Sequence, residues 1–207
     1  MNSVEFIQAK LNLIPQIFDH IKQWKEVRQK LVTATKVAEI VNCTPYLNFK
    51  KIVRPTSSRP VTETHQIQST QSTSPKYLSP QEWGIFYEPR AKVDLTQRTL
   101  QAKHFFNLGF ATHPQYSFLG ATPDGLLNVG DQLWLIEIKC PKTRSICDKV
   151  PYYYWLQVQT QLFVWSALLE NHGLHLSGAI YSENQYDDEG CLNHYCDRQI
   201  YLDHRWY

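Results

Sequence analysis

The chain of 207 residues is 43% hydrophobic and 13% aromatic, which excludes a disordered chain and suits one packed domain, although two small domains would also fit the length. The formal net charge of +2 excludes a polybasic tail protein, so nucleic-acid binding would need a local basic patch. The chain has neither an apolar run of about 18 residues nor the features of a signal peptide. We therefore expect an intracellular protein of the cytoplasm or nucleus, not secreted and not held in a membrane.

The first part of the chain is predicted to be helical. Apolar side chains recur at helical spacing over residues 3–30, with a break near Pro15. A second helix is expected to begin at Thr33 or Thr35, because either can serve as its N-cap, and to end at Asn42.

Residues 55–80 differ in composition from the rest of the chain. Ser, Thr, Gln and Pro dominate, and large apolar side chains are nearly absent. This composition predicts a mobile surface loop. It does not indicate a boundary between two domains, because neither flank alone would make a convincing core. A third helix is expected to follow, from Pro80 or Gln81 to Phe106.

The second half of the chain alternates between strand and helix patterns. Apolar and β-branched residues favour strands within residues 109–129 and 133–141. Residues 151–173 favour a long helix that ends in a glycine able to adopt the left-handed conformation. Residues 176–183 favour another strand, and residues 198–203 favour a last one. This order indicates an α/β fold in which a mixed β-sheet is flanked by helices.

The candidate chemistry lies in the segment ATPDGLLNVGDQLWLIEIKCP. Glu137 and Lys139 are two residues apart in a predicted strand, so their side chains point to the same face. A two-residue type II′ turn at Gly130-Asp131 would reverse the chain, because glycine suits the first central position. Counting outward from that turn places Asp124 opposite Glu137, with β-carbons roughly 4.5–5.5 Å apart.

Two carboxylates at that separation repel each other unless a cation lies between them. Hard oxygen ligands from one or two carboxylates and water are those that Mg²⁺ prefers. The spacing therefore predicts a magnesium site at Asp124 and Glu137 with Lys139 beside it. The alternative is a weak, solvent-facing pair of Glu137 and Lys139, but the apolar run around them favours a central strand.

Pro-Asp followed by Glu-x-Lys is the motif of the PD-(D/E)XK nuclease superfamily. The blocks GATPDGLL, LIEIKCP and QVQTQLFVW, preceded by VRQKLVTATKVAEIV and WGIFYEPRA, resemble in order those of the lambda-type exonucleases, also called the YqaJ-like viral recombinase family. The resemblance covers residues 27–185 apart from the Ser- and Thr-rich loop. It implies a restriction-endonuclease-like core in a single nuclease domain over residues 1–207, with the loop at 55–80.

The resemblance also implies roles for individual residues of the metal site. Asp124 and Glu137 would bind the metal, and the carbonyl of Ile138 would be a further ligand. Lys139 would position or deprotonate the attacking water and stabilise the negative charge that develops. Glu88 would add a carboxylate from the preceding helix. The alternative for Glu88 is a first-turn helix acid, favoured by the helix dipole.

Further residues would bind within the site or hold the DNA end. Gln157 would hydrogen-bond within the site, whereas Gln159 would point away from it. Arg28, Thr33 and Thr35 would form the pocket for the 5′-phosphate. Thr35 stands where the family usually has Ser, a change that keeps the hydroxyl group. A solvated arginine on a helix is the alternative for Arg28.

Other conspicuous side chains are interpreted as structural. His113 is expected to pack at a strand end rather than act as a general base. Cys191, His194 and Cys196 are crowded, but they lack the second ligand pair that tetrahedral sites usually show. Ordinary reduced cysteines are expected there, and a metal site is the alternative. The aromatic residues of the long helix favour a core over a base-stacking surface: Tyr153, Tyr154, Trp155, Phe163 and Trp165.

The expected function follows from the resemblance. It implies a Mg²⁺-dependent exonuclease, with Mn²⁺ as a substitute, that degrades double-stranded DNA from 5′-phosphorylated ends in viral or phage-type recombination or replication. A single-strand annealing protein and a homo-oligomer are the implied partners. A structure-specific or nicking endonuclease on the same fold is the alternative. A non-catalytic DNA-binding module is a third reading, but acids placed near phosphates would weaken its binding.

Overall fold

The computed structural model describes residues 2–19, 23–41, 43, 75–146 and 148–205. Most of the predicted loop, residues 55–74, lies outside this part of the chain; its end forms a single 3₁₀ turn, η2, at Pro75–Tyr77. Among the described residues, no helix combines the length and apolar character needed to cross a bilayer.

The centre of the fold is a five-stranded mixed sheet with the strand order β2-β5-β6-β7-β8. Its middle strand, β6, is antiparallel to β5 and parallel to β7. The strands are β2 Ala102–Phe106, β5 Gly125–Val129, β6 Gln132–Lys139, β7 Gly178–Tyr186 and β8 Leu192–Ile200.

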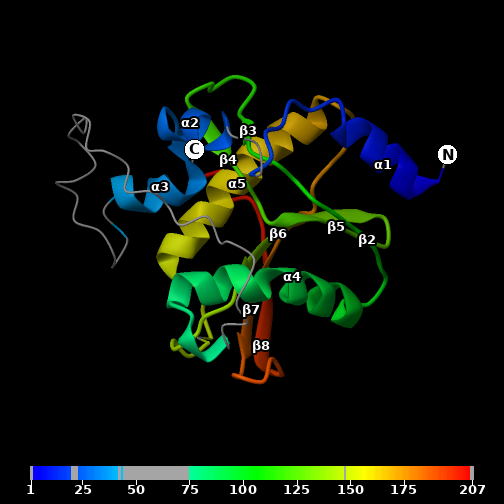
Figure 1. The fold of residues 1–207 in the computed structure, drawn as a ribbon. Helices are drawn as coiled ribbons and strands as arrows, with labels where there is room; N and C mark the ends of the chain where they lie inside the picture. Colours follow the sequence, from blue (N-terminus) through cyan, green and yellow to red (C-terminus); the bar gives the residue numbers. More distant parts are fainter. Residues whose placement is uncertain (1, 20–22, 42, 44–74, 147, 206–207) are drawn as a thin grey trace.

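Two long helices, α4 (Pro80–Arg98) and α5 (Tyr152–Glu170), cover opposite faces of this sheet (Figure 1). The strand β6 alternates between them. Ile136 and Ile138 belong to the apolar cluster under α4, and Leu133 and Leu135 belong to the cluster under α5. Residues 137 and 139 continue the α5 face because side chains alternate along a strand. The mixed sheet between helices confirms the α/β class.

The N-terminal region and the chain before the hairpin form a further layer on the α5 side of this sheet. It contains α1 (Ser3–Leu11), α2 (Gln23–Gln29) and α3 (Ala34–Ile40). A small sheet with the order β1-β4-β3 joins Val32–Thr33, Leu119–Ala121 and Ala111–Thr112.

The break near Pro15 is wider than predicted, because Ile17 leaves the helical path and forms a bridge with Phe110. Thr33 is the N-cap of α3, as one of the two predictions had it. The predicted helix end, Asn42, lies outside the described residues.

The third helix ends earlier than predicted. A capping box between Ser79 and Glu82 starts α4, which ends at Arg98 rather than at Phe106. The next residues form β2, paired with β5. The reason is that side chains in this segment alternate between the two faces of the sheet. Phe106 packs with the cluster under α5, whereas Phe105 packs with the cluster under α4. A helix cannot point adjacent side chains to opposite faces of one sheet.

The hairpin has the predicted register. Val129 pairs with Gln132, and the ladder continues to Gly125 opposite Ile136. Gly130 has a φ of +58°, as a type II′ turn requires.

The last helix and the last strand differ in how well they were predicted. The helix α5 stops before Gly173, whose φ is +74°, as predicted. The strand β8 begins at Leu192 rather than at 198. It is an edge strand with exposed polar residues, so its sequence carries little apolar alternation.

Candidate active site

Glu137 is the centre of the candidate site. Its side chain is 2% exposed and lies on the α5 face of the middle strand. Its carboxylate forms an ion pair with Lys139 Nζ and accepts hydrogen bonds from Gln157 Nε2 at 2.6 Å and Gln161 Nε2 at 2.7 Å. A carboxylate has about four lone-pair sites, so three donors leave one direction open for a further ligand.

Asp124 stands beside Glu137, immediately beyond the paired part of β5. Its amide donates to the Ile136 carbonyl at 2.9 Å, and its Oδ2 accepts from the Ile138 amide at 2.6 Å. Burial and the charge of Glu137 raise the pKa of Asp124 well above its ordinary value, although Lys139 opposes this. The two acids therefore repel each other, and a cation between them would relieve that repulsion.

Lys139 is held as an ammonium group. Burial lowers its pKa, but the charges of Glu137 and Asp124 outweigh this effect and the pKa lies above the ordinary value. The Tyr154 ring centroid is 4.9 Å from Nζ. A charged lysine in this position can stabilise a developing negative charge or orient a water molecule.

Glu88 faces the same region from α4. Its Oε1 is 2.8 Å from Lys92 Nζ, and its charge contributes to the raised pKa of Asp124. The alternative of a first-turn acid is wrong, because Glu88 lies in the middle of α4 and Pro89 is accommodated inside that helix.

The donor set fits a small divalent cation. Asp124, Glu137 and Glu88 offer carboxylate oxygens, which are the ligands that Mg²⁺ prefers. The amide and carbonyl of one strand residue point to the same edge, so the Ile138 carbonyl is directed to the side on which its amide meets Asp124.

Within the described part of the chain, no three His, Cys, Asp or Glu side chains gather closely enough to hold a metal by themselves. The carbonyl of Ile138 and water would therefore complete the coordination. Cys191, His194 and Cys196, on and beside the edge strand, are among these described residues, and Cys191 is exposed.

A cavity of about 680 Å³, named the catalytic cavity after the predicted catalytic residues in its lining, joins these acids to the predicted DNA-binding residues. Asp124, Glu137, Lys139 and Gln157 line it together with Glu88, Arg28 and Thr35. Thr33 is not part of this lining. It lies 3% exposed, its hydroxyl is 3.1 Å from that of Thr35, and it lines a neighbouring hollow shared with Arg28 and Thr35.

Arg28 is oriented by neutral groups. Its Nη1 donates to Thr122 Oγ1 at 3.2 Å, and its guanidinium carbon lies 4.1 Å from the Trp24 ring centroid. Burial lowers the pKa of Arg28 from its ordinary value. No described carboxylate forms an ion pair with it, so its charge is available to an anion in the cavity.

Two residues of the site were not predicted. Gln161 donates to both Glu137 Oε2 and the Thr122 carbonyl, and Thr122 lines the cavity beside Arg28. The sequence contained a signal for Gln161, because residues four apart share a helix face, so Gln161 lies on the face of Gln157.

Gln159 points away, as predicted, and forms hydrogen bonds with the C-terminal segment. For Thr122 the only signal was its place two residues before Asp124.

Most of the residues that were predicted to be structural pack inside the protein. His113 is buried, its Nδ1 accepts from the amides of Gln115 and Tyr116, and its ring stacks on Phe163. Trp165 belongs to the core. Tyr154 is an exception, because it also lines a second cavity beside Lys139.

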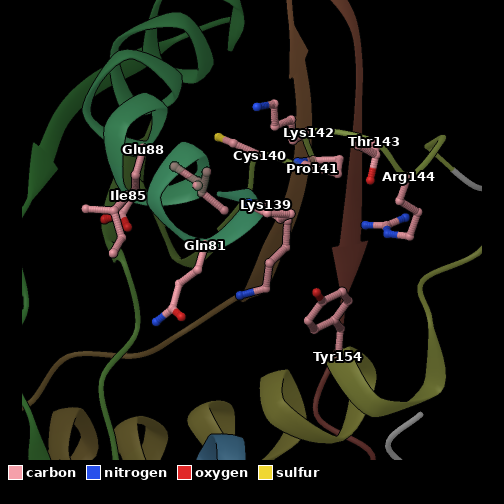
Figure 2. A pocket seen from close by; sticks show the side chains of 13 residues that line it. Gln81, Ile85, Glu88, Lys139, Cys140, Pro141, Lys142, Thr143, Arg144 and Tyr154 are labelled. Atoms are coloured by element: carbon pink, nitrogen blue, oxygen red, sulfur yellow. The ribbon is translucent and has the colours of Figure 1, made fainter. Parts of the chain in front are cut away.

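This second cavity has a volume of about 500 Å³ and lies between the start of α4, the end of β6 and Tyr154 (Figure 2). Glu88 and Lys139 line both cavities, so the two hollows meet at these residues.

Known protein sequences resemble this chain. The profile of the YqaJ-like viral recombinase domain matches residues 23–168. The uncharacterised protein R354 of Acanthamoeba polyphaga mimivirus is 30% identical over 168 residues, which are 73% of this chain and 28% of that protein. The chain thus spans little more than a quarter of that relative's length.

Solved structures share the fold. An alkaline exonuclease from Laribacter hongkongensis, LHK-Exo, superposes with a TM-score of 0.56 at 23% identity, over 90% of this chain and 84% of that one. Its complex with dAMP superposes with a TM-score of 0.57 at 23% identity, over 88% and 83% of the two chains. This likeness confirms the restriction-endonuclease-like α/β fold.

Proposed function

This chain belongs to the family of YqaJ-like viral recombinase domains, and from that premise we propose that it is a metal-dependent exonuclease that degrades double-stranded DNA from its 5′ ends. The observation that carries the proposal is the meeting of Asp124, Glu137 and Lys139 in one cavity with Arg28. The fold shared with an alkaline exonuclease supports it.

Each residue of the site has a distinct task in this reaction. Asp124, Glu137 and the Ile138 carbonyl would hold Mg²⁺, or Mn²⁺ in its place, with Glu88 approaching from α4. The bound cation supplies Lewis-acid stabilisation of the reacting phosphate and lowers the pKa of water. Lys139 directs its ammonium group at the attacking water or at the charge developing on the phosphate.

Neighbouring hydrogen-bond donors hold the two carboxylates in place. Gln157 holds Glu137 Oε1, and the Ile138 amide holds Asp124 Oδ2. Each bond removes freedom from a carboxylate that must point at one position, and such preorganisation lowers the barrier.

The 5′ polarity is proposed from the other end of the catalytic cavity. Arg28 offers a guanidinium without a carboxylate partner among the described residues, and Thr35 and Thr122 add hydroxyl groups beside it. A terminal phosphate carries more charge and more free oxygens than an internal diester, so such a pocket favours a 5′-phosphorylated end. The dAMP bound to LHK-Exo is a nucleoside monophosphate, which is the kind of product this reaction releases.

The family also supports a biological setting. We propose that the protein acts in viral or phage-type recombination or replication, inside the cytoplasm or nucleus, with a single-strand annealing protein as partner and as a homo-oligomer. Double-stranded DNA with 5′-phosphate ends is the proposed substrate.

The test is a digest of end-labelled linear duplexes, bearing either a 5′-phosphate or a 5′-hydroxyl, beside closed circular DNA. We expect cleavage with Mg²⁺ and none with EDTA, faster degradation of phosphorylated ends, and intact circles. Arg28→Ala should lose the preference for phosphorylated ends, because an Arg–phosphate hydrogen bond contributes about 1.5–3 kcal/mol, while cleavage itself persists. Circles cut as fast as linear DNA, with no effect of the 5′ group, would instead support an endonuclease.

A further inference from the structure

The second cavity is lined by more cationic than acidic side chains. Its lining contains three cationic side chains, Lys139, Lys142 and Arg144, and one acidic side chain, Glu88. Three of these charged groups form ion pairs: Glu88 with Lys92, Lys139 with Glu137, and Arg144 with Glu183. Among the described residues, Lys142 is therefore the cation of this lining without a carboxylate partner. Figure 2 shows Lys139 extending between Gln81 of α4 and Tyr154 of α5, with Lys142 and Arg144 on the segment that follows the strand.

Lys142 is fixed in space without losing its charge. Its Nζ donates to the backbone carbonyls of Lys76 at 2.7 Å and Leu78 at 2.6 Å. It also lies 5.2 Å from the ring centroid of Trp83, which is 1% exposed. Carbonyl groups are neutral, and no described carboxylate forms an ion pair with Lys142. An ammonium group has three donors, so one remains for a ligand.

The arrangement of the two cavities indicates the direction in which a DNA strand would run past these charged groups. Of these two cavities, Arg28 lines the catalytic one, Lys142 lines the second one, and Lys139 lines both. A DNA strand whose 5′-phosphate rests on Arg28, and whose next phosphate lies at Lys139, continues into the second cavity with its 3′ side.

We propose that the second cavity binds the strand on the 3′ side of the scissile bond, and that Lys142 is the fixed contact for one internucleotide phosphate there. The ligand class is a DNA phosphodiester anion. This inference rests on the proposed exonuclease function, because that function sets the direction of the strand.

A purely structural role for Lys142 would have a different signature. In that case its two carbonyl bonds would serve only to tie η2 to the end of β6, and its loss would lower stability without regard to the DNA. A test must therefore change the DNA as well as the protein.

The experiment compares variants on 5′-phosphorylated duplexes in which single phosphates 3′ of the scissile bond are replaced, one at a time, by neutral methylphosphonates. For the wild type, we expect one position at which kcat/KM falls about tenfold, the effect of losing about 1.4 kcal/mol. Lys142→Met should lose about tenfold on unmodified DNA and nothing further on that modified duplex. Lys142→Arg should keep the sensitivity, because it keeps the charge.

Lys149→Met is the matched control. Lys149 is exposed on the same segment and lines neither cavity, so this variant should show the wild-type sensitivity at every position. The proposal is overturned if Lys142→Met is as sensitive as the wild type at every position. It is also overturned if this variant loses the same factor on all duplexes together with melting temperature. A wild type that does not degrade unmodified phosphorylated duplexes overturns the exonuclease function itself, and this inference with it.

Discussion

Gln161 connects the two parts of the catalytic cavity. It is 1% exposed, and its Nε2 donates to Glu137 Oε2 at 2.7 Å and to the Thr122 carbonyl at 3.3 Å. Thr122 in turn accepts from Arg28. One amide group therefore holds both a metal-binding carboxylate of the proposed mechanism and the backbone beside the proposed phosphate pocket. Its task is to keep these two positions at a constant separation.

Replacing Gln161 by Met keeps the volume and removes both hydrogen bonds. We expect kcat to fall about tenfold to a hundredfold, since a hydrogen bond to a charged group contributes about 1.5–3 kcal/mol, and KM to change much less. The measurement is steady-state kinetics on a 5′-phosphorylated duplex together with the melting temperature. Gln159→Met is the control, because Gln159 is equally buried on the same helix but bonds with residues 201–203. A similar loss of kcat in both variants would contradict a specific role for Gln161.

At the scale of the elements, Gly125 explains how two strands position Asp124. A β-carbon at residue 125 would lie 2.2 Å from Phe105 Cε1 and 2.9 Å from the Phe106 carbonyl oxygen. The paired strand β2 therefore places the Phe105 ring and the Phe106 carbonyl so close to residue 125 that only glycine fits immediately after Asp124. The glycine of the Pro-Asp-Gly motif is thus a packing requirement of the neighbouring strand.

Gly125→Ala should accordingly destabilise the protein by about 1–3 kcal/mol through overpacking and should impair cleavage by displacing Asp124. Urea unfolding gives the first quantity and a nuclease assay the second. Gly84→Ala in α4 is a control of opposite sign. Among the described residues, no atom beyond the chain neighbours and the backbone of α4 lies within 4 Å of its added β-carbon, and alanine stabilises a helix interior by about 0.5–1 kcal/mol. Unchanged stability in Gly125→Ala would show that Phe105 yields at little cost.

Local rules predicted the hairpin of β5 and β6 because its turn sets its register. Once Gly130 occupies the first position of the turn, simple counting pairs Gly125 with Ile136 and brings Asp124 to Glu137. The strand β2 was missed because its residues continue a helical composition, and its extended form depends on pairing with β5, a distant part of the chain. The start of β8 was missed because its polar residues face solvent at the sheet edge. Gln161 lay on the predicted face, but its reach to Glu137 depends on how closely α5 packs against β6.

At the scale of the whole molecule, the proposed catalytic and phosphate-binding residues belong to different layers. Glu137 and Lys139 lie on a strand bonded to neighbours on both sides. Arg28 lies on α2, a helix of seven residues without a buried side chain. The following strand, β1, pairs with β4 over two residues only. Figure 1 shows α2 and α3 beside α5, apart from the strands β2, β5 and β6.

Segments with little apolar burial open locally at a lower free energy than the central strands of a sheet. In native-state hydrogen exchange, the amides of residues 23–33 should therefore exchange through local opening, whereas those of residues 132–139 should exchange only on global unfolding. At urea concentrations below the global transition, the protein should lose its preference for 5′-phosphorylated ends while it still hydrolyses DNA. Equal protection of both segments would contradict this. Mild denaturation would then turn an end-selective enzyme into a less discriminating one before it turns it into an inactive one.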